Sequence, residues 1–179
     1  MPALVEPMSA DDNRDIVPQP LTAAGFAAFG DVLEDSTAPV MINDGMCRRH
    51  GDLAGLDFDS SGRGGISLFV SKIRTLPYEF ELLERHPLGS QAFLPMDGVP
   101  FLVIAAAGDS APGRPVAFET DPYQGVNFHR NVWHGVLTPL GGSGRFAVVD
   151  WIGDAGNLQT HRFERPYRVV RSIRGAQDS

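Results

Sequence analysis

Residues 100–108, PFLVIAAAG, form a near-continuous apolar run that decides the fold class. A strand with one solvent-exposed face alternates apolar and polar residues, whereas a strand buried on both faces is apolar throughout. Other strand-like runs flank this one, separated by turn signals such as GGSG (141–144); they include GISLFVSKI (65–73), QAFLPM (91–96) and RFAVVDWIG (145–153). Turns at intervals of roughly 8–12 residues are typical of sandwiches and barrels. The pattern predicts an all-β fold, an antiparallel β-barrel or jelly roll.

One short helix is expected near the N-terminus, in LTAAGFAAFGDVLE (21–34). Thr22 is a suitable N-cap, alanine favours the helix, and Gly30 is a suitable stop. The preceding IVPQP (16–20) is predicted to be an edge strand, because proline cannot donate to a sheet ladder. The expected organisation is a flexible tail at 1–14, one barrel domain at 15–170 and a flexible tail at 171–179.

The overall composition argues against several classes of function. A net charge of −7 disfavours a surface for nucleic acid or an anionic membrane, although a pocket for a small anion needs only one or two cations. The N-terminus has no signal-peptide pattern, and no run approaches the ~20 apolar residues of a membrane helix. The one cysteine, Cys47, cannot form an internal disulfide and is expected to be a small buried residue. These features predict a cytoplasmic protein.

Two segments concentrate the polar side chains that carry chemistry, ELLERHPLGSQAFLPMDG (81–98) and GVNFHRNVWHGVLTP (125–139). In the first, Glu84 and His86 are two residues apart, so both side chains leave the same face of a strand. Gln91 is predicted to begin the partner strand across the HPLGS turn (86–90). The second segment places His134 after a tight reversal at Arg130 and Asn131. Both segments flank the apolar run, which predicts a shared site.

This arrangement resembles the two motifs of cupin barrels, H-x-H-(x)3–4-E with a later Gly, and P-x-G-x-x-H. Glu84 falls at the first His of that pattern, His86 at the second and Gln91 at the Glu, while His134 falls at the final His. Two of the four usual metal-ligand positions therefore hold His. A set of two His and one Glu is able to bind a divalent metal. A metal site that has become a metal-free acid–base site fits the same residues.

The two segments together resemble the signature of the ureidoglycolate lyase (ureidoglycolate hydrolase) family. The similarity extends from LTAAGFAAFGDVLE through MINDG (41–45) and ISLFVSKIRTLP (66–77) to about Phe163. The resemblance implies a cupin-type barrel, a homodimer, and the cleavage of (S)-ureidoglycolate to glyoxylate and urea in allantoin and purine catabolism. This reaction is that of a carbon–nitrogen lyase of the amidine-lyase type.

Cleavage of ureidoglycolate needs a base for its hydroxyl proton and a donor for the departing nitrogen. Histidine ordinarily titrates near pH ~6.5, so His134 and His86 are candidates for both roles. Glu84 is expected to orient the ring of His86 or to act as the base. The same three residues are the candidate ligands of a divalent metal such as nickel.

The substrate also carries a carboxylate and a ureido group, which need their own binding residues. Arg130 offers a bidentate fork for the carboxylate, and Lys72 is a second candidate, although both also suit solvent-exposed positions. The uncharged side chains of Asn43, Gln91 and Asn131 are candidates for binding the ureido group, which has both donors and an acceptor.

Two other functions remain open from the sequence. One is a metal-dependent cupin enzyme of another class, a dioxygenase or an isomerase, against which the absence of His at 84 and of Glu at 91 counts. The other is a non-catalytic cupin that binds a small molecule. The sequence contains no DNA-binding segment through which such a sensor would act.

Overall fold

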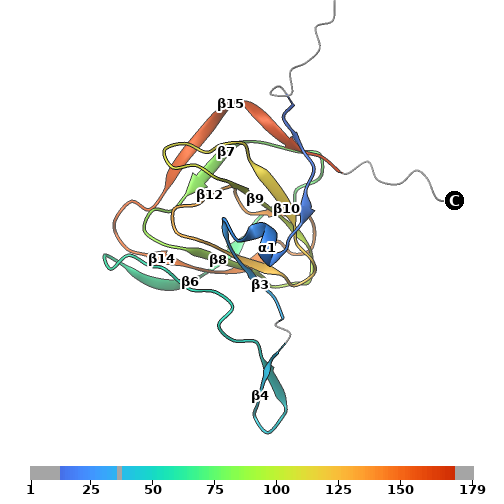
Figure 1. The fold of residues 1–179 in the computed structure, drawn as a ribbon, viewed down its shortest axis with the longest axis vertical. Coiled ribbons are helices and arrows are strands. Elements are labelled where there is room, and N and C mark those ends of the chain that lie inside the picture. Colours follow the sequence, from blue (N-terminus) through green and yellow to red (C-terminus); the bar gives the residue numbers. More distant parts are fainter. Residues whose placement is uncertain (1–12, 36–37, 172–179) are drawn as a thin grey trace, which may run out of the picture.

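The computed structural model describes residues 13–35 and 38–171. It is nearly all β, with 47% strand and 3% helix, which confirms the predicted all-β, cupin-like class. Two curled sheets enclose a common core, and a small hairpin projects away from them (Figure 1). Apart from residues 13, 14 and 171, the tails predicted at 1–14 and 171–179 lie outside the described residues.

The larger sheet has eight strands in the order β1-β15-β7-β12-β9-β10-β2, with β13 also paired to β9. Its pairs are antiparallel except at the two edges, where β1 and β2 are parallel to their neighbours. Its strands are β1 (Asp15–Ile16), β2 (Gln19–Pro20), β7 (Tyr78–Arg85), β9 (Phe101–Ala106), β10 (Val116–Glu119), β12 (Trp133–His134), β13 (Thr138–Pro139) and β15 (Gln159–Val169).

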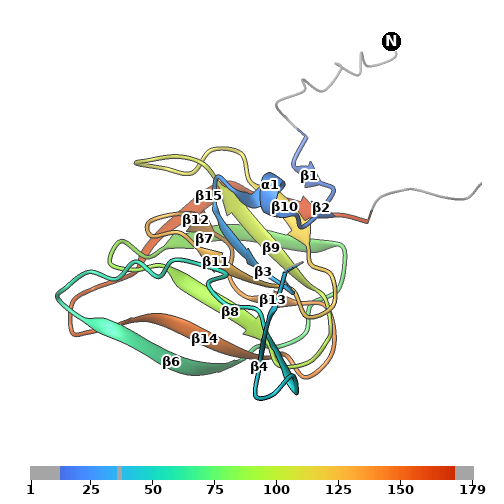
Figure 2. The ribbon, with the colours of Figure 1, turned by 60° about the horizontal axis from the view of Figure 1, so that its bottom comes forward.

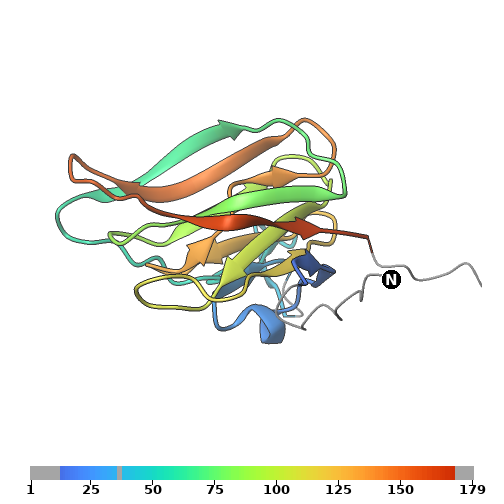
Figure 3. The same cartoon turned by 90° about the horizontal axis from the view of Figure 1, so that it is seen from above.

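The smaller sheet has five antiparallel strands in the order β3-β11-β8-β14-β6 (Figure 2). They are β3 (Gly30–Leu33), β6 (Arg63–Val70), β8 (Gln91–Pro95), β11 (Gly125–Phe128) and β14 (Arg145–Ile152). Seen from above, β6 and β14 run together along one side of the molecule, and the short helix lies on the other (Figure 3). The projecting hairpin pairs β4 (Val40–Ile42) with β5 (Cys47–Arg49).

The apolar run that predicted the fold forms β9, and all six of its residues are buried. Its alternate side chains enter two different clusters. Phe101, Val103 and Ala105 pack between the two sheets, against side chains that include Phe93, Phe128 and Val148. Leu102, Ile104 and Ala106 pack on the opposite face of the larger sheet, against side chains that include Phe80, Leu83 and Trp133. Burial on both faces explains why the run has no polar alternation.

The helix α1 is shorter than the sequence predicted. It spans Ala23–Phe26, and the Thr22 hydroxyl caps it by accepting from the Gly25 N–H, as expected. The helix ends at Phe26, four residues before the predicted stop at Gly30, where the chain enters β3. A Cβ at Gly30 would lie 2.0 Å from the Asn127 carbonyl oxygen of β11, the strand that pairs with β3. Glycine here permits close strand pairing.

Three local predictions were wrong. IVPQP does not form one edge strand: it divides between β1 and β2, which lie at opposite edges of the larger sheet. Cys47 is exposed on the projecting hairpin and is not buried. Gln91 does not begin the partner of β7, because β7 pairs with β15 and β12 whereas β8 belongs to the smaller sheet. The HPLGS segment therefore crosses from one sheet to the other.

Candidate active site

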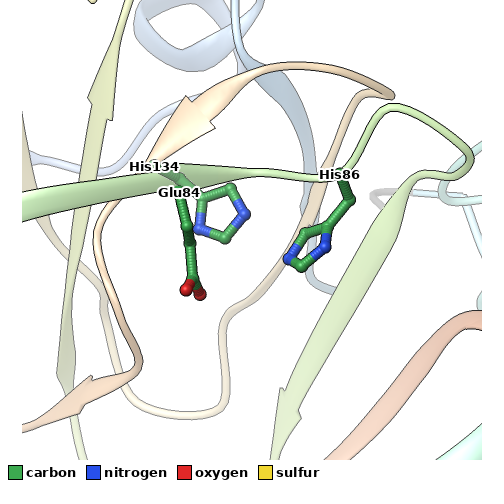
Figure 4. Close-up of side chains that lie close together, drawn as sticks. All are labelled: Glu84, His86 and His134. Atoms are coloured by element: carbon green, nitrogen blue, oxygen red, sulfur yellow. The ribbon is translucent and has the colours of Figure 1, made fainter. Parts of the chain in front are cut away.

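Glu84, His86 and His134 converge as the motif spacing predicted. His134 of β12 is the direct cross-strand partner of Glu84 on β7, and His86 follows the end of β7. Their candidate ligand atoms all lie within 4.8 Å of one another. The two imidazole centroids are 5.3 Å apart, and the three side chains point toward a common space (Figure 4). Within residues 13–35 and 38–171, no other group of three His, Cys, Asp or Glu side chains is gathered in this way.

Both imidazoles are held by main-chain carbonyl groups through the same ring nitrogen. His86 Nδ1 lies 2.7 Å from the Asn157 carbonyl oxygen, and His134 Nδ1 lies 3.0 Å from the Gly135 carbonyl oxygen. Because a carbonyl oxygen only accepts, each Nδ1 carries the proton and donates it. Each ring then directs its Nε2 away from that carbonyl group, and both Nε2 atoms are buried with no hydrogen-bond partner among the described residues.

Burial controls the charge of two members of the cluster. His134 is 2% exposed, and this burial lowers its pKa to about 3, although the bond to Gly135 acts in the opposite direction. Burial also raises the pKa of Glu84, while His86 lowers it electrostatically. The ring of Phe128 stacks on His134 at 4.3 Å between centroids and 16° between planes. His134 is therefore a neutral imidazole in an apolar setting.

The donor set fits a divalent transition metal. Two imidazoles whose Nε2 atoms make no hydrogen bond and one carboxylate match the ligand types of such sites. A ligating histidine ordinarily donates its other N–H to a carbonyl or carboxylate, which is the arrangement of His86 and His134. His86 and His134 would hold the ion, with the Glu84 carboxyl group within 4.8 Å of both.

Arg130 does not offer a free guanidinium to a substrate. Its Nε donates to the Pro87 carbonyl oxygen at 2.5 Å, and its Nη2 donates to Asp59 at 3.2 Å. Its Nη1 lies 3.6 Å from an oxygen of Asp57. The side chain thus joins segment 57–59 to the turn after His86, and the predicted carboxylate fork is occupied by protein groups.

The other predicted binding residues lie in different places. Asn131 is exposed with φ 68°, and its N–H donates to the His86 carbonyl oxygen, so its main chain positions that histidine. Asn43 lies at the exposed turn of the β4–β5 hairpin, which projects away from both sheets (Figure 1). Lys72 is exposed and follows the C-terminal end of β6, which is at Val70. Of the predicted binding residues, Gln91 alone is a buried side chain of the barrel interior.

Sequence reasoning overlooked Asp150, a partly buried carboxylate on β14. The Gln91 and Ser67 side chains hydrogen-bond to it, and His86 acts on it electrostatically. Burial nevertheless raises the pKa of Asp150. A signal was present in RFAVVDWIG, where Asp150 continues the alternation of the core residues Phe146 and Val148.

Comparison with known proteins decides the family. A sequence model of the ureidoglycolate lyases matches residues 13–170. The chain belongs to the ureidoglycolate lyase family. A ureidoglycolate lyase of Rhodobacter capsulatus is 58% identical over 153 residues, which are 84% of this chain and 95% of the relative. Ureidoglycolate lyase 2 of Rhizobium meliloti is 47% identical, over 84% of this chain and 94% of its own length.

A third relative extends the match to another genus. The ureidoglycolate lyase of a Chelativorans species is 44% identical over 87% of this chain and 96% of its own. The family resemblance inferred from the two motifs is thus confirmed. In the described part of the chain, no helix is long and apolar enough to span a membrane.

Proposed function

We propose that this member of the ureidoglycolate lyase family cleaves ureidoglycolate to glyoxylate and urea, as a carbon–nitrogen lyase of the amidine-lyase type in allantoin and purine catabolism. The observation that carries the proposal is the convergence of Glu84, His86 and His134 in a chain matched by the family over residues 13–170. Three relatives that bear this name match 84–87% of the chain.

The reaction is an elimination whose atoms balance without water. The hydroxyl group of ureidoglycolate loses its proton, and its oxygen forms the carbonyl of glyoxylate. The bond between that carbon and the ureido nitrogen breaks, and its electron pair stays on nitrogen. One proton added to this nitrogen completes urea. The site must therefore accept one proton and deliver one.

Glu84 is the residue we assign to this proton transfer. Burial raises the pKa of its carboxyl group, which brings it closer to neutral pH, where proton exchange is efficient. His134 suits a different role, because burial keeps its imidazole neutral with Nε2 free as a lone-pair donor. We assign His134 and His86 to holding a divalent cation, beside which the Glu84 carboxyl group stays available for proton exchange. Such a cation, when bound, supplies Lewis acidity toward a substrate oxygen.

The test compares the wild-type protein with Glu84→Gln, which keeps the side-chain shape and removes the proton acceptor. Purified proteins are incubated with ureidoglycolate, and glyoxylate is measured. Loss of a general acid–base group ordinarily lowers kcat by ~10²–10⁴-fold. The matched control is Glu79→Gln, an exposed glutamate on the same strand, which is expected to keep wild-type kcat. Absence of glyoxylate with the wild-type protein refutes the proposed function.

We also propose that the protein is a two-fold homodimer in the cytoplasm. Alternate residues of the edge strand β6 expose apolar side chains, Ile66 by 83% and Val70 by 64%, and Leu94 on the same sheet face is 40% exposed. An apolar edge of this kind favours pairing with a second copy. Sedimentation at micromolar concentration should give twice the 19.3 kDa chain mass; a monomer mass contradicts the dimer. The single free Cys47 suits a reducing compartment.

A further inference from the structure

Asp150 occupies a position where an apolar side chain is expected. Phe146 and Val148 precede it at alternate positions of β14, and their side chains lie in the core between the two sheets. Because side chains two residues apart share a face, the Asp150 carboxyl is directed toward the same interior. A partly buried carboxylate is costly unless polar groups or a ligand satisfy it. Its presence here therefore needs an explanation.

The protein satisfies this carboxylate only in part. The Ser67 hydroxyl lies 3.4 Å from Asp150 Oδ1, and the Gln91 side chain also hydrogen-bonds to it. Among the described residues, no arginine or lysine forms an ion pair with Asp150, and His86 acts on its carboxylate electrostatically. The carboxylate thus lies in the neighbourhood of the Glu84, His86 and His134 cluster without a permanent cationic partner.

The Gln91 side chain provides a second hydrogen-bond acceptor beside the Asp150 carboxylate. Its side chain is 6% exposed, and because a carboxylate accepts, the Gln91 amide nitrogen is the donor to Asp150. Its Oε1 is left buried without a hydrogen-bond partner among the described residues. Gln91 pairs across strands with Phe128, whose ring stacks on His134. One aromatic ring therefore connects this acceptor pair with the imidazole cluster.

We propose that Asp150 and Gln91 Oε1 form the subsite that binds the N–H groups of the ureido part of the substrate. This inference rests on the proposed function and adds Asp150 as a specificity-determining residue. A ureido group presents one N–H and one NH₂, so it offers donors to both a carboxylate and an amide oxygen. Because His86 and His134 are assigned to the cation, the imidazole cluster is left to the carboxylate and hydroxyl end of the substrate.

The test uses two stable probes that differ in the ureido group. Oxalurate carries a carboxylate and a ureido group, whereas oxalate carries two carboxylates and no N–H group. Binding of each to the metal-loaded protein as purified is measured by titration calorimetry, which does not depend on turnover. Asp150→Asn replaces one acceptor oxygen with a donor of the same size. We expect its affinity for oxalurate to fall at least tenfold and its affinity for oxalate to stay within about twofold.

Two further variants keep the result interpretable. Gln91→Met removes the second acceptor at similar volume and is expected to show the same selective loss. Asp154→Asn, an exposed site shortly after β14, is the matched control and should bind both probes as the wild type does. An equal loss of both probes, or no loss of oxalurate, overturns the subsite. If the wild type cleaves ureidoglycolate in either of those cases, only this inference fails; if it does not cleave, the proposed function fails.

Discussion

Replacing Arg130 with methionine separates two explanations of this residue. In the structure its guanidinium binds the Pro87 carbonyl oxygen at 2.5 Å and Asp59 at 3.2 Å. Methionine keeps much of the side-chain length and removes every donor. If Arg130 is a structural link, the variant loses stability and the position of His86, the neighbour of Pro87, becomes less well defined.

The magnitude follows from the partners. A hydrogen bond from a charged donor contributes about 1.5–3 kcal/mol, and a partly exposed ion pair contributes about 0.2–1 kcal/mol. The Arg130 and Asp59 side chains are 31% and 33% exposed, so we take a total loss of about 2–3 kcal/mol. For a domain of this size, 1 kcal/mol shifts Tm by about 2–4 °C. The expected decrease in Tm is therefore roughly 4–12 °C.

The assay combines thermal unfolding, followed by circular dichroism, with steady-state kinetics on ureidoglycolate. We expect kcat to fall about tenfold, because small displacements of catalytic groups are costly, while KM changes little. Asp59→Asn should give a smaller decrease in Tm, and the double variant should be less destabilised than the sum of the two. Arg48→Met, on the exposed hairpin strand β5, is the control. An unchanged Tm with a tenfold higher KM would show that Arg130 instead binds the substrate carboxylate.

Three shorter predictions concern the metal, the core and one buried charge. His86→Ala should reduce bound divalent metal at least tenfold by elemental analysis, and chelation of the wild type should abolish glyoxylate formation until metal is restored; an active, chelated wild type argues against a metal. Gly30→Ala places a Cβ 2.0 Å from the Asn127 carbonyl oxygen and should cost about 1–3 kcal/mol in urea unfolding, whereas Gly156→Ala, with open space around it, should not. Burial raises the pKa of Asp150 above 3.8, so ionisation of its carboxyl group destabilises the folded state as pH rises. Asp150→Asn should therefore be more stable than the wild type at pH ~7. This difference in stability should vanish well below pH ~4, where the carboxyl group is protonated in both the folded and the unfolded state. A less stable variant at neutral pH would show that its hydrogen bonds outweigh burial.

The sequence predicted features that depend on local pattern. The doubly buried β9 follows from its unbroken apolar run, and the closeness of Glu84 and His86 follows from their two-residue spacing. The Thr22 cap is similarly local. What joined His134 to these residues was the resemblance to two-motif cupin barrels, because no local pattern gives the register between β12 and β7.

The sequence did not predict features that long-range contacts decide. Gln91 was placed in a hairpin with β7, because a short Gly-containing turn ordinarily joins paired strands; here the chain changes sheets. Arg130 was interpreted from its chemistry alone, and its acidic partner Asp59 is 71 residues away in the sequence. Asn43 was chosen by residue type, without a spatial constraint on its hairpin. Asp150 had a local signal in the alternation of β14, but its significance depends on Gln91 of a neighbouring strand.

The most direct test of the central claim is a single reaction in which urea, glyoxylate and ammonia are measured together. Purified protein is mixed with ureidoglycolate, and samples are quenched over several turnovers. An elimination by the Glu84, His86 and His134 site releases urea and glyoxylate in equal amounts at every time point, with no ammonia above the protein-free control. Ammonia formed in step with glyoxylate, without urea, would mean that the ureido carbonyl is hydrolysed and would contradict the lyase assignment.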